Sequence, residues 1–126
     1  MTEHGPETEI RLFRIVRSLT PVRQDVLSDK ARGKPLPLDP RLSNLHDGLS
    51  MFATLAQALQ KARRYPVLGQ YIAEIRLTRG PFVRVERTID RSQGHHTVWA
   101  DPDALLQSIV RIVPVMDDEK GGNDGL

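Results

Sequence analysis

Apolar residues recur at every second position in three stretches of the chain between residues 70 and 100. The alternating sets are Ala73, Ile75 and Leu77, then Val83 and Val85, then Val98 and Ala100, which share their face with the polar His96. Because successive side chains of a β-strand point to opposite faces of a sheet, a period of two predicts strands that bury one face. Turn residues at 78–81 and 90–94 separate these strands. The pattern therefore favours an antiparallel sheet, in which we expect the first two strands to pair as a hairpin.

Three other segments carry the signals of helix ends. Thr20 precedes a proline at the first position of a predicted helix over residues 21–31. A Thr-x-x-Gln capping box starts a second helix over residues 54–65, which ends before a proline. An aspartate followed by a proline starts a third, with apolar positions that continue to residue 110. We therefore expect about three helices.

Further strands complete the predicted fold. Residues 10–19 fit a helical stripe as well as a buried strand, and we favour the strand. Residues 48–53 are typical of a short buried strand. Residues 112–116 predict a closing strand at an edge, because Pro114 has no amide hydrogen to donate. The order of elements predicts a single α+β domain over residues 10–116, with a mostly antiparallel mixed sheet.

The charges are unevenly distributed along the chain. The formal net charge is +2, but residues 1–9 and residues 117–126 each sum to −3, so the body between them carries +8. The two ends are polar and lack hydrophobic periodicity, and we expect them to be mobile. The body contains 14 arginines, whose planar guanidinium binds phosphate or carboxylate by two parallel hydrogen bonds. We therefore expect an anionic small molecule, an acidic protein or a nucleic acid as partner.

Composition excludes several classes of function. Without cysteine the chain forms no disulfide, thiolate metal site or thiol nucleophile, and it lacks the apolar run of ~20 residues that crosses a membrane. We therefore expect a protein of the prokaryotic cytoplasm with no membrane contact. His95 and His96 are adjacent and would point to opposite faces of a strand, so we expect no metal site. Neither a nucleophile elbow nor a glycine-rich phosphate loop is present.

Two residues fit both a chemical and a structural role, and for each we favour the structural one. Asp101 lies two residues from Asp103, as in an acid–base pair, but aspartate before a proline is also an ordinary N-cap. Trp99 is suited to stack on a nucleobase or on nicotinamide, but a single tryptophan in an alternating strand more often belongs to a core.

The order of elements resembles that of the compact ADP-ribosyltransferase-like folds, which include RNA 2′-phosphotransferases. The resemblance covers residues 10–116 and rests on the segments LFRIVRS, GLSMFAT with LAQALQKARRYP, YIAEIRL, and HHTVWADPDALLQSIVRIVPV. It implies NAD or an ADP-ribose compound as ligand. Arg14 or Arg17 on the first strand would hold the phosphates, and Ser50 would support the nicotinamide ribose. Many such transferases place a glutamate on a late strand, where this chain has histidines and Asp101.

Two hypotheses of different classes follow. In the enzyme hypothesis, Arg14 binds phosphate, Ser50 binds a ribose hydroxyl, and Tyr71 or Trp99 stacks on a ring. In the same hypothesis, His96 or Asp101 polarises the attacking group. In the alternative, a non-catalytic interaction module binds an acidic protein or a nucleic acid through arginines on the solvent face of the predicted hairpin. These arginines are Arg76, Arg79, Arg84 and Arg87. The enzyme hypothesis requires its residues to converge on one pocket.

Overall fold

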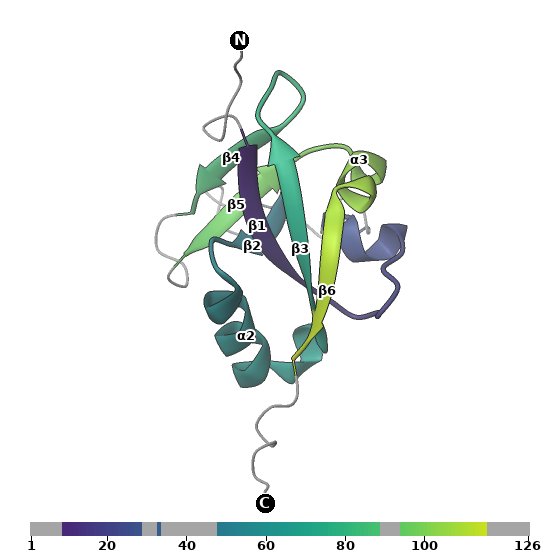
Figure 1. The fold of residues 1–126 in the computed structure, drawn as a ribbon, viewed down its shortest axis with the longest axis vertical. Coiled ribbons are helices and arrows are strands. Elements are labelled where there is room, and N and C mark those ends of the chain that lie inside the picture. Colours follow the sequence, from purple (N-terminus) through teal and green to yellow (C-terminus); the bar gives the residue numbers. More distant parts are fainter. Residues whose placement is uncertain (1–8, 29–32, 34–47, 89–93, 116–126) are drawn as a thin grey trace, which may run out of the picture.

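Six strands form one sheet in the order β4-β5-β2-β1-β3-β6, and every neighbouring pair is antiparallel (Figure 1). The computed structural model describes residues 9–28, 33, 48–88 and 94–115. The strands are β1 (Glu9–Val16), β2 (Leu49–Phe52), β3 (Tyr71–Thr78), β4 (Arg84–Arg87), β5 (His95–Trp99) and β6 (Ile109–Pro114). The α+β class and the antiparallel sheet are as predicted, while the expected mobile ends lie almost wholly outside the described residues.

Strand β1 lies inside the sheet, hydrogen-bonded to β2 on one side and β3 on the other. Its even-numbered residues Leu12 and Val16 are buried on one face of the sheet, and Phe13 is buried on the other. A strand that is covered on both faces needs apolar residues at consecutive positions. This requirement explains why residues 10–19 also fit a helical pattern, and the predicted strand is confirmed over Glu9–Val16.

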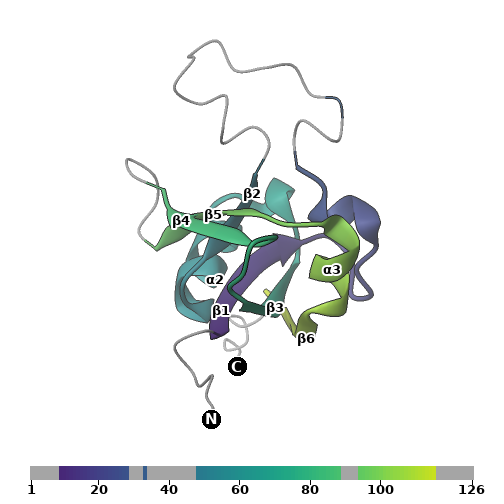
Figure 2. The same cartoon turned by 90° about the horizontal axis from the view of Figure 1, so that it is seen from above.

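The two faces of the sheet are covered by different helices. Helix α2 (Leu55–Arg64) packs Ala58 and Ala62 on one face, which we call the α2 face. The 3-10 helix η2 (Arg23–Val26) and helix α3 (Pro102–Gln107) cover the other, the α3 face. Figure 2 shows the two α-helices well apart on either side of the sheet strands. The core of the α3 face holds Leu12, Val16, Val26, Leu49, Met51, Ala73, Ile75, Leu77, Val98 and Leu105.

Strands β3 and β4, which were predicted to pair as a hairpin, are not neighbours in the sheet. Strand β3 pairs with β1 and β6, whereas β4 pairs with β5 at the far edge of the sheet. Between them, the tight turn of residues 80–83 is closed by the amide of Val83, which donates to the carbonyl of Gly80. Both predicted strands are confirmed, but the alternation of side chains along a strand does not specify which strand pairs with it.

The described residues contain two α-helices rather than about three. The first predicted helix is reduced to the four residues of η2, because Asp25 accepts hydrogen bonds from the amides of Arg17 and Val22 and Leu27 is already extended. Residues 29–31 of that prediction lie outside the described part of the chain. The third predicted helix ends at Gln107, and residues 109–110 begin β6 instead. Strand β6 lies at the edge, as its proline predicted.

Candidate functional site

Arg14, the arginine of the apolar opening strand, is held by the protein's own backbone. Its Nε donates to the carbonyl oxygen of Asp25 at 2.7 Å, and its Nη1 donates to the carbonyl oxygen of Ser50 at 2.9 Å. Its position between Leu12 and Val16 and its contact with η2 place it on the α3 face. Hydrogen bonds to carbonyls meet the cost of partly burying a guanidinium, which removes the observation that suggested an anion at this residue.

The other predicted site residues lie on both faces of the sheet. Tyr71 packs against the core of the α3 face, and His96 shares that face because it pairs directly with Met51. Ser50 pairs with Thr97, so the Ser50 side chain lies on the α2 face together with Trp99. The backbone of Ser50 therefore touches Arg14, while its hydroxyl points away from that guanidinium.

Three of these residues have structural partners. The carboxylate of Asp101 accepts the amide of Ala104 at 3.1 Å and so caps α3, one of its two predicted roles. The Nδ1 of His96 bonds the carbonyl oxygen of Gly94 at 2.8 Å. The guanidinium of Arg84 stacks 3.9 Å from the centre of the Trp99 ring. Arg17 is exposed, and its backbone amide bonds Asp25. Within the described residues, the predicted ligand-binding and catalytic side chains therefore do not converge on one face of the sheet.

The arginines assigned to the predicted hairpin are also separated. Arg76 lies on β3 and Arg84 on β4, and the strands β1, β2 and β5 lie between them in the sheet. Within β4, Arg84 and Arg87 point to opposite faces, because they are three positions apart. These residues are exposed as predicted, but they do not form one patch on a hairpin.

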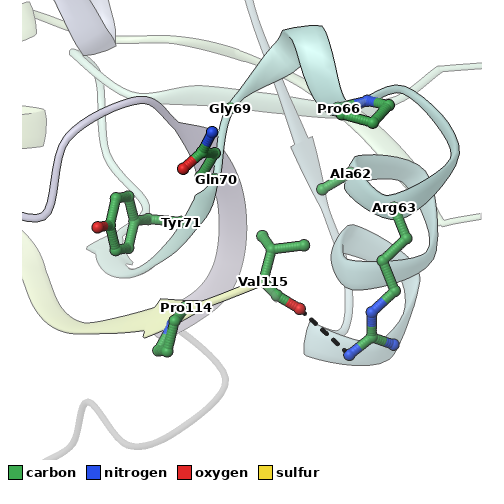
Figure 3. A pocket seen from close by; sticks show the side chains of 8 residues that line it. All are labelled: Ala62, Arg63, Pro66, Gly69, Gln70, Tyr71, Pro114 and Val115. Carbon is green, nitrogen blue, oxygen red and sulfur yellow. Dashed lines mark hydrogen bonds between the residues drawn. The ribbon is translucent and has the colours of Figure 1, made fainter. Parts of the chain in front are cut away.

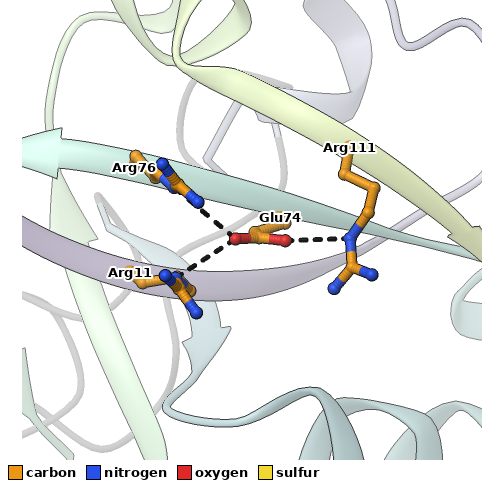
Figure 4. Close-up of polar contacts among 4 residues, drawn as sticks. All are labelled: Arg11, Glu74, Arg76 and Arg111. Atoms are coloured by element: carbon orange, nitrogen blue, oxygen red, sulfur yellow. Dashed lines mark hydrogen bonds and ion pairs between the residues drawn. The ribbon is translucent and has the colours of Figure 1, made fainter.

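A different set of arginines does converge, on the α2 face. Arg11 of β1, Arg76 of β3 and Arg111 of β6 surround the carboxylate of Glu74, and we call these four residues the arginine cluster (Figure 4). The Nε of Arg111 donates to Oε1 of Glu74 at 2.9 Å. The Nε atoms of Arg11 and Arg76 lie 3.2 and 3.6 Å from Oε2. Three neighbouring strands thus contribute one guanidinium each to a single carboxylate.

Strand register explains this convergence. Arg11 pairs with Arg76, and Glu74 pairs with Arg111, so all four side chains emerge on one face of adjacent strands. Glu74 also pairs with Phe13, which belongs to the core beneath α2. The Glu74 side chain is consequently only 6% exposed, whereas the three arginine side chains remain 46–59% exposed. The cluster lies beside the part of the sheet that α2 covers (Figure 4).

The cluster carries a surplus of positive charge. Three guanidinium groups share one carboxylate, which leaves a net charge of +2. All the contacts to Glu74 use the Nε atoms, and within the described residues no other group bonds the terminal nitrogens of Arg11, Arg76 and Arg111. These terminal nitrogens are the edge of the guanidinium that binds carboxylate or phosphate in a two-pronged contact.

Sequence reasoning missed this cluster. The period of two in β3 puts Glu74 and Arg76 on the face opposite Ile75, but it does not connect them with Arg11 or Arg111. The available signal was the alternation in β1, which puts Arg11 on the same face as Phe13. Only knowledge of the β1-β3-β6 order brings the four side chains together.

The described part of the chain contains neither a group of metal ligands nor a membrane-spanning helix. No three histidine, aspartate or glutamate side chains within it lie close enough to bind a metal ion. None of the helices in the described ranges has the length and apolar character needed to span a bilayer. Comparisons with models of protein families, with curated proteins and with solved structures found no match to this chain. The geometry of the arginine cluster is therefore the main guide to function.

Proposed function

We propose that this protein is a non-catalytic binding module that holds an anionic macromolecule on the arginine cluster. The observation that carries the proposal is the imbalance of the cluster, in which three half-exposed guanidinium groups share one nearly buried carboxylate. Like charges at such short range repel one another, and an anion that arrives at the terminal nitrogens relieves this repulsion.

Glu74 has a positioning role in this proposal. A free arginine side chain loses rotational freedom when it binds, and this loss reduces affinity. Contacts from Glu74 to each Nε hold the three guanidinium groups in place before the partner arrives. The terminal nitrogens then meet phosphate or carboxylate oxygens at a lower entropic cost.

The open position of the cluster favours a large partner. A small anion on a half-exposed surface competes with water and salt, whereas a polyanion contacts several cations at once and releases its counterions. An acidic protein and a nucleic acid both have the required charge. An enzyme acting on NAD or ADP-ribose is the less favoured function, because the side chains it requires lie on opposite faces of the sheet.

The test measures binding of the full chain to two labelled probes, a nucleic-acid oligonucleotide and poly-glutamate, by fluorescence anisotropy at several salt concentrations. One variant combines Arg11→Gln, Glu74→Gln, Arg76→Gln and Arg111→Gln. It lowers the net charge by two and leaves no buried carboxylate without a partner. The matched control, Arg79→Gln with Arg87→Gln, removes the same net charge at exposed positions outside the cluster.

We expect the cluster variant to bind its preferred probe about tenfold more weakly, and the control less than about threefold more weakly. For a nucleic acid, the cluster variant should also have a shallower salt dependence, because fewer counterions are released. Preference for poly-glutamate would assign an acidic protein as the partner. The proposal fails if neither probe binds the native protein, or if the control loses as much affinity as the cluster variant.

A further inference from the structure

The positive charge of the arginine cluster is concentrated at one point of the sheet. The Nε atoms of Arg11, Arg76 and Arg111 all lie within 3.6 Å of a single carboxylate group, that of Glu74. The strands that carry the three arginines are neighbours, so the cluster extends roughly 10 Å across the sheet. A surplus of two positive charges over this short span complements a compact dianion better than single charges that are spaced along a chain.

The cluster is bounded along the strands by groups that do not bind anions. Toward α2, Glu74 pairs with Phe13 of the buried core. In the other direction, Glu9 pairs with Thr78, and strand alternation puts Glu9 on the same face as Arg11, two positions or about 7 Å away. The exposed carboxylate of Glu9 repels a second anionic group beside the first. A nucleic acid brings such further phosphates, whereas a protein segment can present a neutral or basic residue to Glu9.

A phosphorylated serine or threonine has the charge that this surface requires. Its phosphate carries about −1.5 to −2 at pH 7 and has three acceptor oxygens, whereas the carboxylate of a glutamate carries a single charge. Coulomb energy is proportional to the product of the charges, so the phosphate gains close to twice as much from the same cations. Arginine clusters are a common means of binding phosphorylated side chains, because one guanidinium contacts two phosphate oxygens at once.

We propose that the arginine cluster recognises a phosphorylated serine or threonine in a segment of another protein. The terminal nitrogens of its arginines hold the phosphate oxygens, and Glu74 keeps the guanidinium groups in place through their Nε atoms. Glu9 favours a neutral or basic residue next to the phosphorylated one. This inference rests on the proposed function, since it names the anionic group that the cluster holds.

A second hollow on the α2 face differs from the cluster in its chemistry. This pocket of about 370 Å³ lies at the opposite end of the face, where α2 approaches the end of β6 (Figure 3). Most of its lining is apolar. Among the described residues that line it, the one arginine is Arg63, whose Nη2 already donates to the carbonyl oxygen of Val115. We therefore expect no phosphate binding at this pocket, and its amides serve as an internal reference in the test.

The test measures binding of short labelled peptides to the full chain by fluorescence anisotropy. One peptide contains a single phosphoserine among glycine and alanine residues. Three others have the same sequence with serine, with glutamate, or with the singly charged methyl ester of phosphoserine at that position. We expect the phosphoserine peptide to bind at least about tenfold more tightly than each of the other three, because it alone presents a dianion.

Two further measurements locate the binding site. The four-residue glutamine variant of the arginine cluster should bind the phosphoserine peptide at least about tenfold more weakly, and the control with Arg79→Gln and Arg87→Gln should bind it like the native protein. Nuclear magnetic resonance titration of the isotope-labelled native chain needs no variant. We expect the phosphoserine peptide to shift the amides of Arg11 and Arg76 and to leave those of Ala62 and Gly69, which line the pocket, unchanged.

The outcomes separate this inference from the proposed function. If poly-glutamate or an oligonucleotide binds through the cluster but the phosphoserine peptide has no advantage over the glutamate and methyl ester peptides, this inference alone fails. If no anionic probe binds, both fail. An oligonucleotide that gains affinity from a 5′-terminal phosphate and binds more tightly than the phosphoserine peptide would assign the site to the end of a nucleic acid and overturn the choice of a protein segment. Equal loss of peptide binding in the cluster variant and the control would also overturn the inference.

Discussion

Glu74 is a nearly buried carboxylate whose environment is unusual for a sheet surface. A carboxylate taken out of water needs charge-assisted hydrogen bonds to offset its lost hydration. Here Arg111 donates one such hydrogen bond at 2.9 Å, and Arg11 and Arg76 add ion pairs at 3.2 and 3.6 Å. Because these arginines remain about half exposed, solvent screens part of each interaction, and the net stabilisation is smaller than in a fully buried pair.

We therefore expect Glu74→Gln to lower the free energy of unfolding by about 1–2 kcal/mol, below the cost of breaking a fully buried pair. Glutamine preserves the size of the side chain but leaves three cations without their counter-charge. Urea denaturation measures the change, and added salt should reduce it by screening. Glu86→Gln is the control, since both side chains of the ion pair between Glu86 and Arg84 are exposed. It should change the free energy of unfolding by less than about 0.5 kcal/mol. Equal stability of Glu74→Gln and the native protein would contradict this account.

The helices are defined by their N-caps. Thr54 accepts the amide of Gln57 at 3.1 Å at the start of α2, and Asp101 accepts the amide of Ala104 at the start of α3. Each cap satisfies one of the amides that have no partner in the first helical turn. Helix α3 has only six residues, so its end effects are a large part of its stability.

A pair of substitutions separates capping from chemistry at Asp101. Asp101→Ala should lower the free energy of unfolding by about 1 kcal/mol, whereas Asp101→Asn, which keeps an accepting oxygen, should have little effect. Thermal or urea denaturation measures both. Asp103→Ala is a suitable control, because its ion pair with Arg23 at 3.4 Å is exposed. If asparagine were as damaging as alanine, capping would not be the role of Asp101 in the fold.

The sheet as a whole has a stable interior and weaker edges. Strand β3 is hydrogen-bonded on both sides, and Ile72, Ala73 and Ile75 within it are fully buried. Strand β4 has four residues, lies at an edge and is mostly exposed. Local opening of a sheet begins where few buried contacts must be broken.

Native-state hydrogen exchange should reproduce this gradient. We expect the amides of Ile72 to Ile75 to exchange more slowly than those of Arg84 to Arg87 by about two orders of magnitude, because the former open only with most of the sheet. Magnetic resonance of the labelled protein resolves these amides. Comparable rates in β3 and β4 would show that the sheet opens as one unit.

Local patterns were sufficient to predict most elements but not their neighbours. The period of two identified the strands at residues 71–78 and 84–87, and the threonine cap identified α2. The hairpin was wrong because any strand edge offers the same amides and carbonyls to any other. The length of the helix predicted over residues 21–31 was too great, and only η2 forms. Asp25 accepts hydrogen bonds from amides that precede it, and the rules for helix caps do not anticipate this contact.

The amino-acid sequence determines the α+β class, the alternation that assigns side chains to faces, and an arginine-rich body of charge +8. These properties depend on the residues themselves and their near neighbours. The order of the strands decides which arginines meet at one carboxylate, since Glu74 and Arg111 are 37 residues apart in the chain. Pairing of distant strands is chosen by simultaneous packing on both faces of the sheet, and that packing exists only in the folded molecule.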